Sequence, residues 1–207
     1  MCGRFAFNPY GNEMLSSLVE KANARLMSDW QNEEHEQTVE PDKITTGEVF
    51  PTNIILTLIG DKSTKNVGAF STDWGIHAKS LIINARSETI QERYTFKSLF
   101  SSYRCVIPTT GFYEWQHLDN KKKKGDKFYL GFGEDEPLFL AGLYKPHANS
   151  KESVIITTTS NESMKDIHDR MPVIIDAKNI RGWLFDEQFA NNYLQTSMPN
   201  LLRNKAF

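Results

Sequence analysis

Cysteine stands at position 2, where removal of Met1 would leave one residue with both a thiol and a free α-amine. An α-amine titrates at about 7.7–8.0 and a thiol at about 8.5, so part of each is nucleophilic at neutral pH. An aldehyde would condense with the amine to a Schiff base, and the adjacent thiol would close a five-membered thiazolidine ring. A retained Met1 would block this chemistry. The alternative role for Cys2 is that of a small buried residue, which is common for free cysteine.

A second candidate is the segment 84–89, Asn-Ala-Arg-Ser-Glu-Thr, which follows an apolar strand and precedes a helical stretch. Backbone amides at the start of a helix favour anions, and Arg86 would add a bidentate phosphate donor. The alternative is a capping turn in which Ser87 is the N-cap residue.

The third candidate is the segment 111–115, Gly-Phe-Tyr-Glu-Trp, in which Glu114 stands among aromatic residues. Apolar surroundings raise the pKa of a carboxyl group, which suits a general acid that must hold a proton near neutrality. The alternative is an exposed strand residue that alternates with a buried Phe112 and a buried Trp115.

The fourth candidate is the segment 167–172, Ile-His-Asp-Arg-Met-Pro. The ordinary pKa of histidine, about 6.5, lets His168 take up and release protons at cellular pH, and Asp169 and Arg170 could orient it or bind phosphate. The alternative is a structural histidine. The chain has no Cys-x-x-Cys or His-x-x-x-His spacing, so we predict no metal site and no other cofactor.

The elements that position these residues form a mixed pattern in which strands outnumber helices. Helices are expected at 13–27, about 88–100 and 177–184, the last with Asp176 as its N-cap. Strands are expected, in chain order, at 3–7, 48–59, 66–74, 81–84, 104–115, 127–132, 137–144 and 153–159. Because regular strand–helix alternation is missing, the pattern indicates an α+β fold with a mostly antiparallel or mixed sheet.

Two polar segments interrupt this pattern. The acidic stretch 28–43 is interpreted as an exposed connection whose charge would repel DNA. The run Lys121–Lys124 lies between two strands, as expected for a hairpin tip. This tip is either a solvated loop or an auxiliary phosphate contact.

Composition places the chain among ordinary globular proteins. Its 207 residues suggest a single domain, and 39% are hydrophobic and 24% charged. Because the net charge is −2, any binding of phosphate would have to come from a local patch of positive charge. We find no membrane helix and no secretory signal, and the two cysteines, Cys2 and Cys105, cannot form a disulfide framework. A cytoplasmic protein is therefore expected.

Taken together and in this order, the four segments resemble the SRAP family, the SOS response-associated peptidases. The resemblance extends from Cys2 to at least Pro172. It implies one compact α+β domain over residues 1–207, with a barrel-like β core and short flanking helices. It also implies a sensor of abasic sites in single-stranded DNA that forms a stable DNA–protein crosslink through its N-terminal cysteine, acts as a monomer, and lies at the nucleoid when bound to DNA.

The resemblance further implies a role for each matching residue. Cys2 would be the nucleophile after autoproteolytic or aminopeptidase removal of Met1, and Asn84 would position it and the sugar. Glu114 would act as acid and base in opening the deoxyribose ring, and His168 would assist Schiff base formation and crosslink reversal. Phosphate and base contacts would come from Arg4, Arg86, Trp74, Trp115, Arg170, Met171 and Pro172.

The sequence departs from the family pattern after Trp74. Family members commonly carry Trp-Gly-Leu-Ile-Pro and a longer loop with a further tryptophan, whereas here Gly75 and Ile76 lead into a short loop that contains His77 and Lys79. One hypothesis is that His77 and Lys79 replace the missing loop contacts through charge.

Two other functions remain open at this point. One is a thiol peptidase in which Cys2 attacks an amide and His168 is the base, although no oxyanion-hole motif is evident. The other is a non-covalent reader of damaged or modified DNA that uses Arg4, Arg86 and the aromatic residues.

Overall fold

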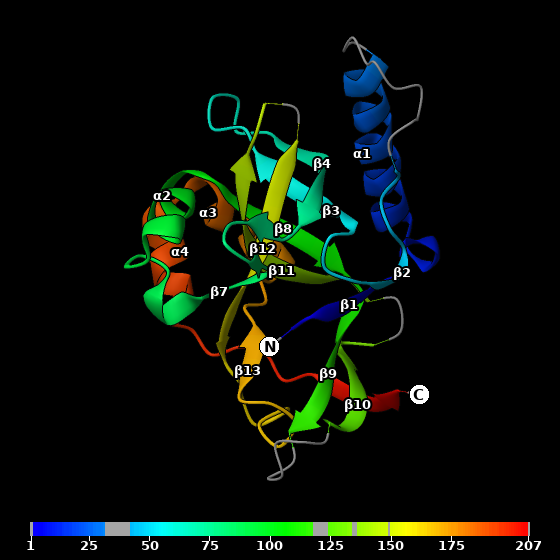
Figure 1. Ribbon diagram of the computed structural model, residues 1–207, viewed down its shortest axis with the longest axis vertical. Coiled ribbons are helices and arrows are strands. Elements are labelled where there is room, and N and C mark those ends of the chain that lie inside the picture. Colours follow the sequence, from blue (N-terminus) through cyan, green and yellow to red (C-terminus); the bar gives the residue numbers. More distant parts are fainter. Residues whose placement is uncertain (1, 32–41, 118–123, 134–135, 149, 207) are drawn as a thin grey trace.

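The computed structural model describes residues 2–31, 42–117, 124–133, 136–148 and 150–206 (Figure 1). Its longest helix, α1 (Glu13–Gln31), follows the short strand β1 (Arg4–Phe7) and begins where the Asn12 Oδ1 atom accepts a hydrogen bond from the Leu15 amide. The other helices are α2 (Tyr94–Ser102), α3 (Ile180–Phe185) and α4 (Glu187–Tyr193). Within the described ranges, no helix is both long enough and apolar enough to cross a membrane.

The remaining strands are short to medium in length and run through the whole chain. In order they are β2 (Gly47–Val49), β3 (Ile54–Gly60), β4 (Val67–Trp74), β5 (Ile76–His77), β6 (Leu81–Ile82), β7 (Asn84–Arg86), β8 (Arg104–Thr109), β9 (Gly111–His117), β10 (Lys124–Gly131), β11 (Leu138–Pro146), β12 (Lys151–Thr159), β13 (Arg170–Pro172) and β14 (Leu202–Ala206).

Two large sheets contain most of these strands. One is antiparallel with the order β14-β10-β9-β1-β2, so β1 is an inner strand between β9 and β2. The other has the order β11-β8-β3-β4-β12-β13, and β7 runs parallel to β12. An additional pairing of β11 with β12 closes a ring of hydrogen-bonded strands in this second sheet. The predicted mixed α+β architecture is confirmed.

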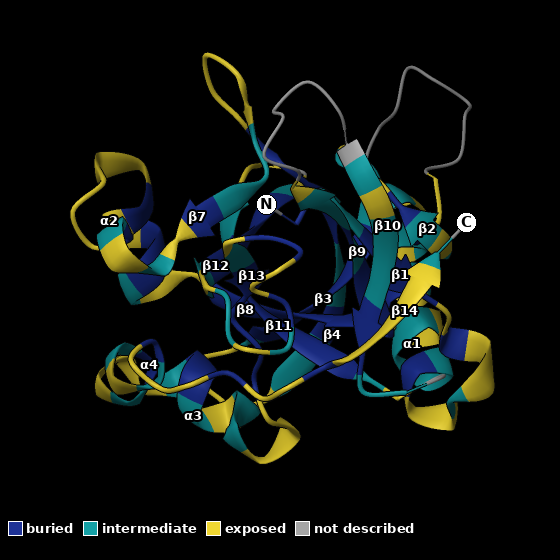
Figure 2. Ribbon diagram, turned by 90° about the horizontal axis from the view of Figure 1, so that it is seen from below, coloured by how far each residue is buried: buried dark blue, intermediate teal, exposed yellow. Residues whose placement is uncertain are grey.

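The core contains side chains from both large sheets, and buried residues fill the centre of Figure 2. All six residues of β8 are buried, as are the first six of β11. Runs of consecutive buried residues are typical of strands covered on both faces, and the mainly apolar residues in these two runs allowed a strand to be predicted at each place.

Several predicted boundaries are corrected by the structure. Helix α1 continues to Gln31, so Ser28 is helical and not part of a connection; residues 32–41 of the acidic stretch lie outside the described part. A 3-10 turn at 87–89 precedes α2, which begins at Tyr94, and Arg86, not Ser87, is the N-cap of that turn. Asp176 does accept a hydrogen bond from the Lys178 amide, as expected of an N-cap. The lysine run joins β9 to β10, but 121–123 are not described.

Candidate active site

Cys2 lies directly ahead of β1 and is almost completely buried, with 1% of its surface exposed. Its Sγ atom lies 3.8 Å from the Arg4 carbonyl oxygen, to which the thiol donates. Burial, and secondly the negative charge of Glu114, raise the pKa of the Cys2 thiol far above its ordinary value. The thiol therefore keeps its proton at neutral pH.

Asn84 holds the backbone of Cys2 from the other sheet. It is the first residue of β7, opposite Ile155 of β12, and its Nδ2 atom donates to the Cys2 carbonyl oxygen at 2.9 Å. The Asn84 Oδ1 atom is buried and makes no hydrogen bond with any residue the structure describes. A buried acceptor of this kind can receive a hydrogen bond from a substrate hydroxyl group.

Glu114 lies in β9, which pairs with β1 so that Arg4 is opposite Tyr113. This register places Glu114 beside the segment that contains Cys2. The Glu114 side chain is 5% exposed, and its Oε1 atom accepts a hydrogen bond from the Trp115 amide at 3.3 Å. Burial raises the pKa of the Glu114 carboxyl, the direction needed for a general acid near neutral pH.

His168 is buried against His117, with 4.0 Å between the two ring centroids. Its Nδ1 atom accepts a hydrogen bond from the Arg170 amide at 2.9 Å and lies 2.8 Å from Asp169 Oδ1. Burial, and then nearby positive charge including that of His117, lower the pKa of His168 to about 4. His168 is therefore a neutral imidazole at cellular pH.

His117 connects these groups and was missed by the sequence analysis. Its amide donates to the Ile167 carbonyl oxygen at 2.8 Å, which ties the end of β9 to the segment that carries His168. Its charge also acts on Glu114, three residues earlier in the same strand. The one feature of the sequence that could have indicated His117 is that it lies in the same strand as Glu114.

The imidazoles of His117 and His168 and the carboxylate of Asp169 offer three possible ligand atoms that lie within 4.8 Å of one another. Two imidazoles and a carboxylate match the donor set of a divalent transition metal. No motif predicted this cluster, because its members come from β9 and from the segment before β13.

The predicted phosphate and base contacts divide into accessible and buried groups. Arg4 and Trp115 lie together on the surface beside Cys2, with the Arg4 guanidinium carbon 5.0 Å from the centre of the Trp115 ring system. Arg86 is exposed at the end of β7. These three residues could contact a DNA strand that passes over the site.

The other predicted contact residues do not offer a free surface. Trp74 is fully buried against Phe5, at 5.0 Å between ring centroids, and its Nε1 atom donates to the Ile83 carbonyl oxygen. A ring without an exposed face cannot stack on a base, so the prediction for Trp74 is wrong.

The segment at β13 also differs from the prediction. Met171 is fully buried in the core and Pro172 is also buried, so neither side chain offers a surface to DNA. The Arg170 guanidinium makes a bidentate ion pair with Glu88, at 2.6 and 2.9 Å, and donates to the Thr157 carbonyl oxygen at 2.7 Å. Arg170 thus connects β13 to the turn after β7. This connection fixes the position of Asn84, in β7, relative to His168, which lies just before β13.

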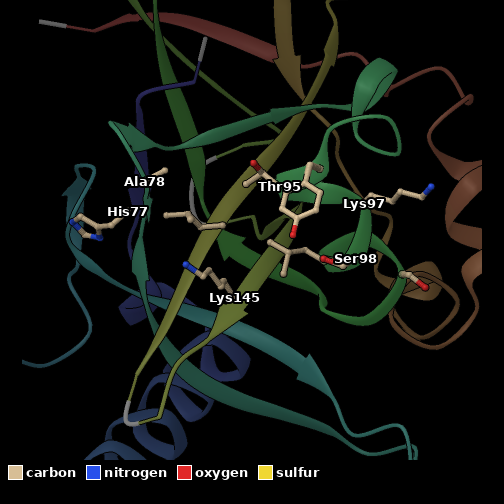
Figure 3. A pocket seen from close by; sticks show the side chains of 10 residues that line it. His77, Ala78, Thr95, Lys97, Ser98 and Lys145 are labelled. Atoms are coloured by element: carbon tan, nitrogen blue, oxygen red, sulfur yellow. The ribbon is translucent and has the colours of Figure 1, made fainter.

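A separate cavity of about 690 Å³ lies between the β5–β6 hairpin and α2 (Figure 3). Figure 3 shows His77 and Ala78 on one side and Thr95 and Ser98 of α2 on the other, with Lys145 between them. The His77 Nδ1 atom lies 2.6 Å from Oε1 of the buried Glu152, whose Oε2 is 2.8 Å from His147 Nε2. The contact of His77 with Glu152 therefore fastens the β5–β6 hairpin to β12.

The neutral state of His168 leads to a prediction for stability. The unfolded chain binds a proton at histidine near pH 6.5, whereas folded His168 binds it only near pH 4. The unfolded state is thus favoured by protonation, and the free energy of unfolding is expected to fall as the pH decreases from about 6.5 to about 4. Urea unfolding at several pH values measures this dependence. The His168→Gln variant should have a shallower slope, and an unchanged slope would contradict the assignment.

Comparison with known proteins identifies the family. The model of the SOS response associated peptidase (SRAP) family matches residues 1–205. The abasic site processing protein YoqW of Bacillus subtilis is 40% identical over 162 residues, covering 72% of this chain and 70% of that protein. The abasic site processing protein YedK of Escherichia coli is 27% identical over 198 residues, covering 90% and 81%.

Solved structures agree on the fold. A crystal structure of a protein from Bordetella bronchiseptica has a TM-score of 0.70 at 17% identity and covers 100% of both chains. Another from Bacteroides thetaiotaomicron has a TM-score of 0.70 at 18% identity, covering 99% of this chain and 91% of that chain. Because the family model matches nearly the whole chain, the chain belongs to the SRAP family.

Proposed function

We propose that this protein recognises abasic sites in single-stranded DNA and joins to them covalently through Cys2 after Met1 is removed. The observation that carries the proposal is the placement of Cys2: it is buried beside Glu114, and Asn84 hydrogen-bonds its backbone. The names of the curated relatives, abasic site processing proteins, support the same substrate.

The reaction begins with the sugar. Glu114 holds a proton because burial raises its pKa. It donates this proton to the ring oxygen of the deoxyribose as the bond from that oxygen to C1′ breaks, and its carboxylate takes up the proton of the C1′ hydroxyl, which leaves an aldehyde. The α-amine of Cys2 attacks the aldehyde carbon, and loss of one water molecule leaves a Schiff base. The thiol sulfur then adds to the same carbon while its proton passes to the former imine nitrogen, which closes the thiazolidine ring.

The surrounding side chains favour this sequence over simple thiolate attack. Because the Cys2 thiol is protonated, the amine reacts first and the thiol follows by proximity. The Asn84 Oδ1 atom is an available acceptor for a sugar hydroxyl, and neutral His168 can accept a proton during Schiff base formation. The raised thiol pKa counts against a general thiol peptidase, which would need a thiolate.

The DNA contacts require no reading of bases. Only an abasic sugar opens to an aldehyde, so the chemistry itself selects the lesion. Arg4 and Arg86 hold flanking phosphates and Trp115 offers a partly exposed ring, so binding is tolerant of sequence and weakened by salt. The protein acts as a monomer in the cytoplasm, at the nucleoid when bound to DNA.

The proposal is tested by mixing Met1-processed protein with an oligonucleotide that carries one abasic site. A covalent species on a denaturing gel, with an intact mass of protein plus DNA minus water, is expected without any reductant. Protein that retains Met1 and the Cys2→Ala variant should form none. If processed protein forms no such species, the covalent function is wrong and a non-covalent reader takes its place.

A further inference from the structure

Two cations and one carboxylate meet on the surface beside Cys2. The Glu48 Oε1 atom lies 3.1 Å from Arg4 Nη1 and 2.9 Å from Lys127 Nζ, and its Oε2 atom lies 3.1 Å from the same Lys127 atom. The three side chains come from β2, β1 and β10. The strand register brings them together, because Glu48 is opposite Ala6 and Lys127 is opposite Trp115.

Aromatic rings surround the two cations. The Arg4 guanidinium lies 4.4 Å from the centre of the Phe50 ring, in addition to its contact with Trp115. The Lys127 Nζ atom lies 4.2 Å from the centre of the Tyr113 ring. Cations beside aromatic rings also line grooves that bind single-stranded nucleic acid.

The carboxylate in this cluster is ionised. Partial burial acts to raise the pKa of Glu48, but the hydrogen bonds from Lys127 and Arg4 outweigh it and lower that pKa. The side chains of Arg4, Lys127 and Glu48 are 36%, 17% and 30% exposed, so an anion from solution can reach them. Arg4 and Lys127 both donate hydrogen bonds to the Glu48 carboxylate, an anion with two acceptor oxygens. A phosphodiester is also an anion with two such oxygens, so the same two donors can bind it.

We propose that Arg4 and Lys127 form a binding subsite for a DNA phosphate, and that the Glu48 carboxylate occupies this subsite in the free protein and competes with the DNA. The inference rests on the proposed function, and it adds Lys127 as a contact and Glu48 as a residue that limits affinity. A phosphate can bind only after the Glu48 ion pairs separate, so intact DNA without a lesion is held weakly and released.

The Glu48→Gln variant tests the competition. It keeps the size of the side chain and one acceptor oxygen but removes the charge that opposes phosphate. Affinity for an end-labelled oligothymidylate, measured by fluorescence anisotropy at several salt concentrations, is expected to rise about three- to tenfold. The logarithmic salt dependence should steepen by about 0.7, the value for one additional phosphate contact on a single strand.

Two further variants make the result specific. Glu20→Gln, at an exposed position of α1, changes the net charge by the same amount and should leave the affinity at the wild-type value. Adding Lys127→Gln to Glu48→Gln should remove most of the gain, because the subsite then lacks one of its cations. Thermal unfolding of each variant establishes that it is folded.

The outcomes separate this inference from the proposed function. If Glu48→Gln binds the oligothymidylate no better than wild type, or more weakly, Glu48 orients the cations instead of competing, and the inference is overturned. If affinity rises as expected while processed wild-type protein fails to crosslink an abasic oligonucleotide, the phosphate subsite stands and the covalent function falls.

Discussion

Protein with Cys2 replaced by serine is expected to form no stable crosslink to an abasic oligonucleotide, yet to form a Schiff base that borohydride traps. Variant protein from which Met1 has been removed still has the α-amine at residue 2, so condensation with the aldehyde remains possible. A hydroxyl group is a much poorer nucleophile than sulfur and does not close a stable ring. Denaturing gels and intact mass, with and without borohydride, distinguish the two adducts.

The second cysteine supplies the matched control for this experiment. Cys105 is fully buried in β8, and its Cys105→Ser variant should crosslink as wild type does without reductant. Equal crosslinking by the Cys2→Ser variant without borohydride would contradict a thiazolidine, since the thiol would then be dispensable.

Replacing Glu114 with glutamine is expected to slow crosslinking by about a hundred- to ten-thousandfold, the usual contribution of a positioned acid or base. Glutamine fills the same space but cannot release a proton to the opening sugar. The raised pKa of Glu114 sets the sign of the pH effect: the carboxyl is protonated below that pKa and loses its proton above it. The wild-type rate should therefore have a descending limb at higher pH that the variant lacks.

Single-turnover rates across a pH series measure this effect. Glu152 is a similarly buried glutamate that pairs with His77 and His147 outside the Cys2 site, so Glu152→Gln is the matched control and should keep the wild-type rate. A Glu114→Gln variant that is folded and crosslinks within about threefold of wild type would remove Glu114 from the mechanism, because a positioned acid is worth far more than that.

The sequence predicted those parts of the fold that depend on a few neighbouring residues, such as a buried strand or a helix cap. The apolar runs of β8 and β11 and the Asp176 cap are short-range patterns, and the structure has a strand or a cap at each place. The single strand expected at 104–115 is divided after Thr109 into β8 and β9. Strand β14 could not be predicted, because it is an exposed edge strand whose partner, β10, lies about seventy residues earlier.

The candidate site follows the same rule. The segments around Cys2, Asn84, Glu114 and His168 could be singled out by residue type, but only tertiary packing decides which side chains remain accessible. Trp74 has the same residue type as Trp115, yet it is completely buried, with Phe5 packed against it. His117 belongs to no motif and enters the site through a backbone hydrogen bond to Ile167.

The inner position of β1 has a consequence for the entropy of the reaction. Chain ends are usually the least ordered part of a protein, but β1 is hydrogen-bonded on both sides and Asn84 holds Cys2 just ahead of it. Once Met1 is removed, amine and thiol are preorganised by folding, so little rotational freedom remains to be lost on reaching the transition state. Mutations that loosen β1 should therefore slow the chemistry even where they touch no reacting atom.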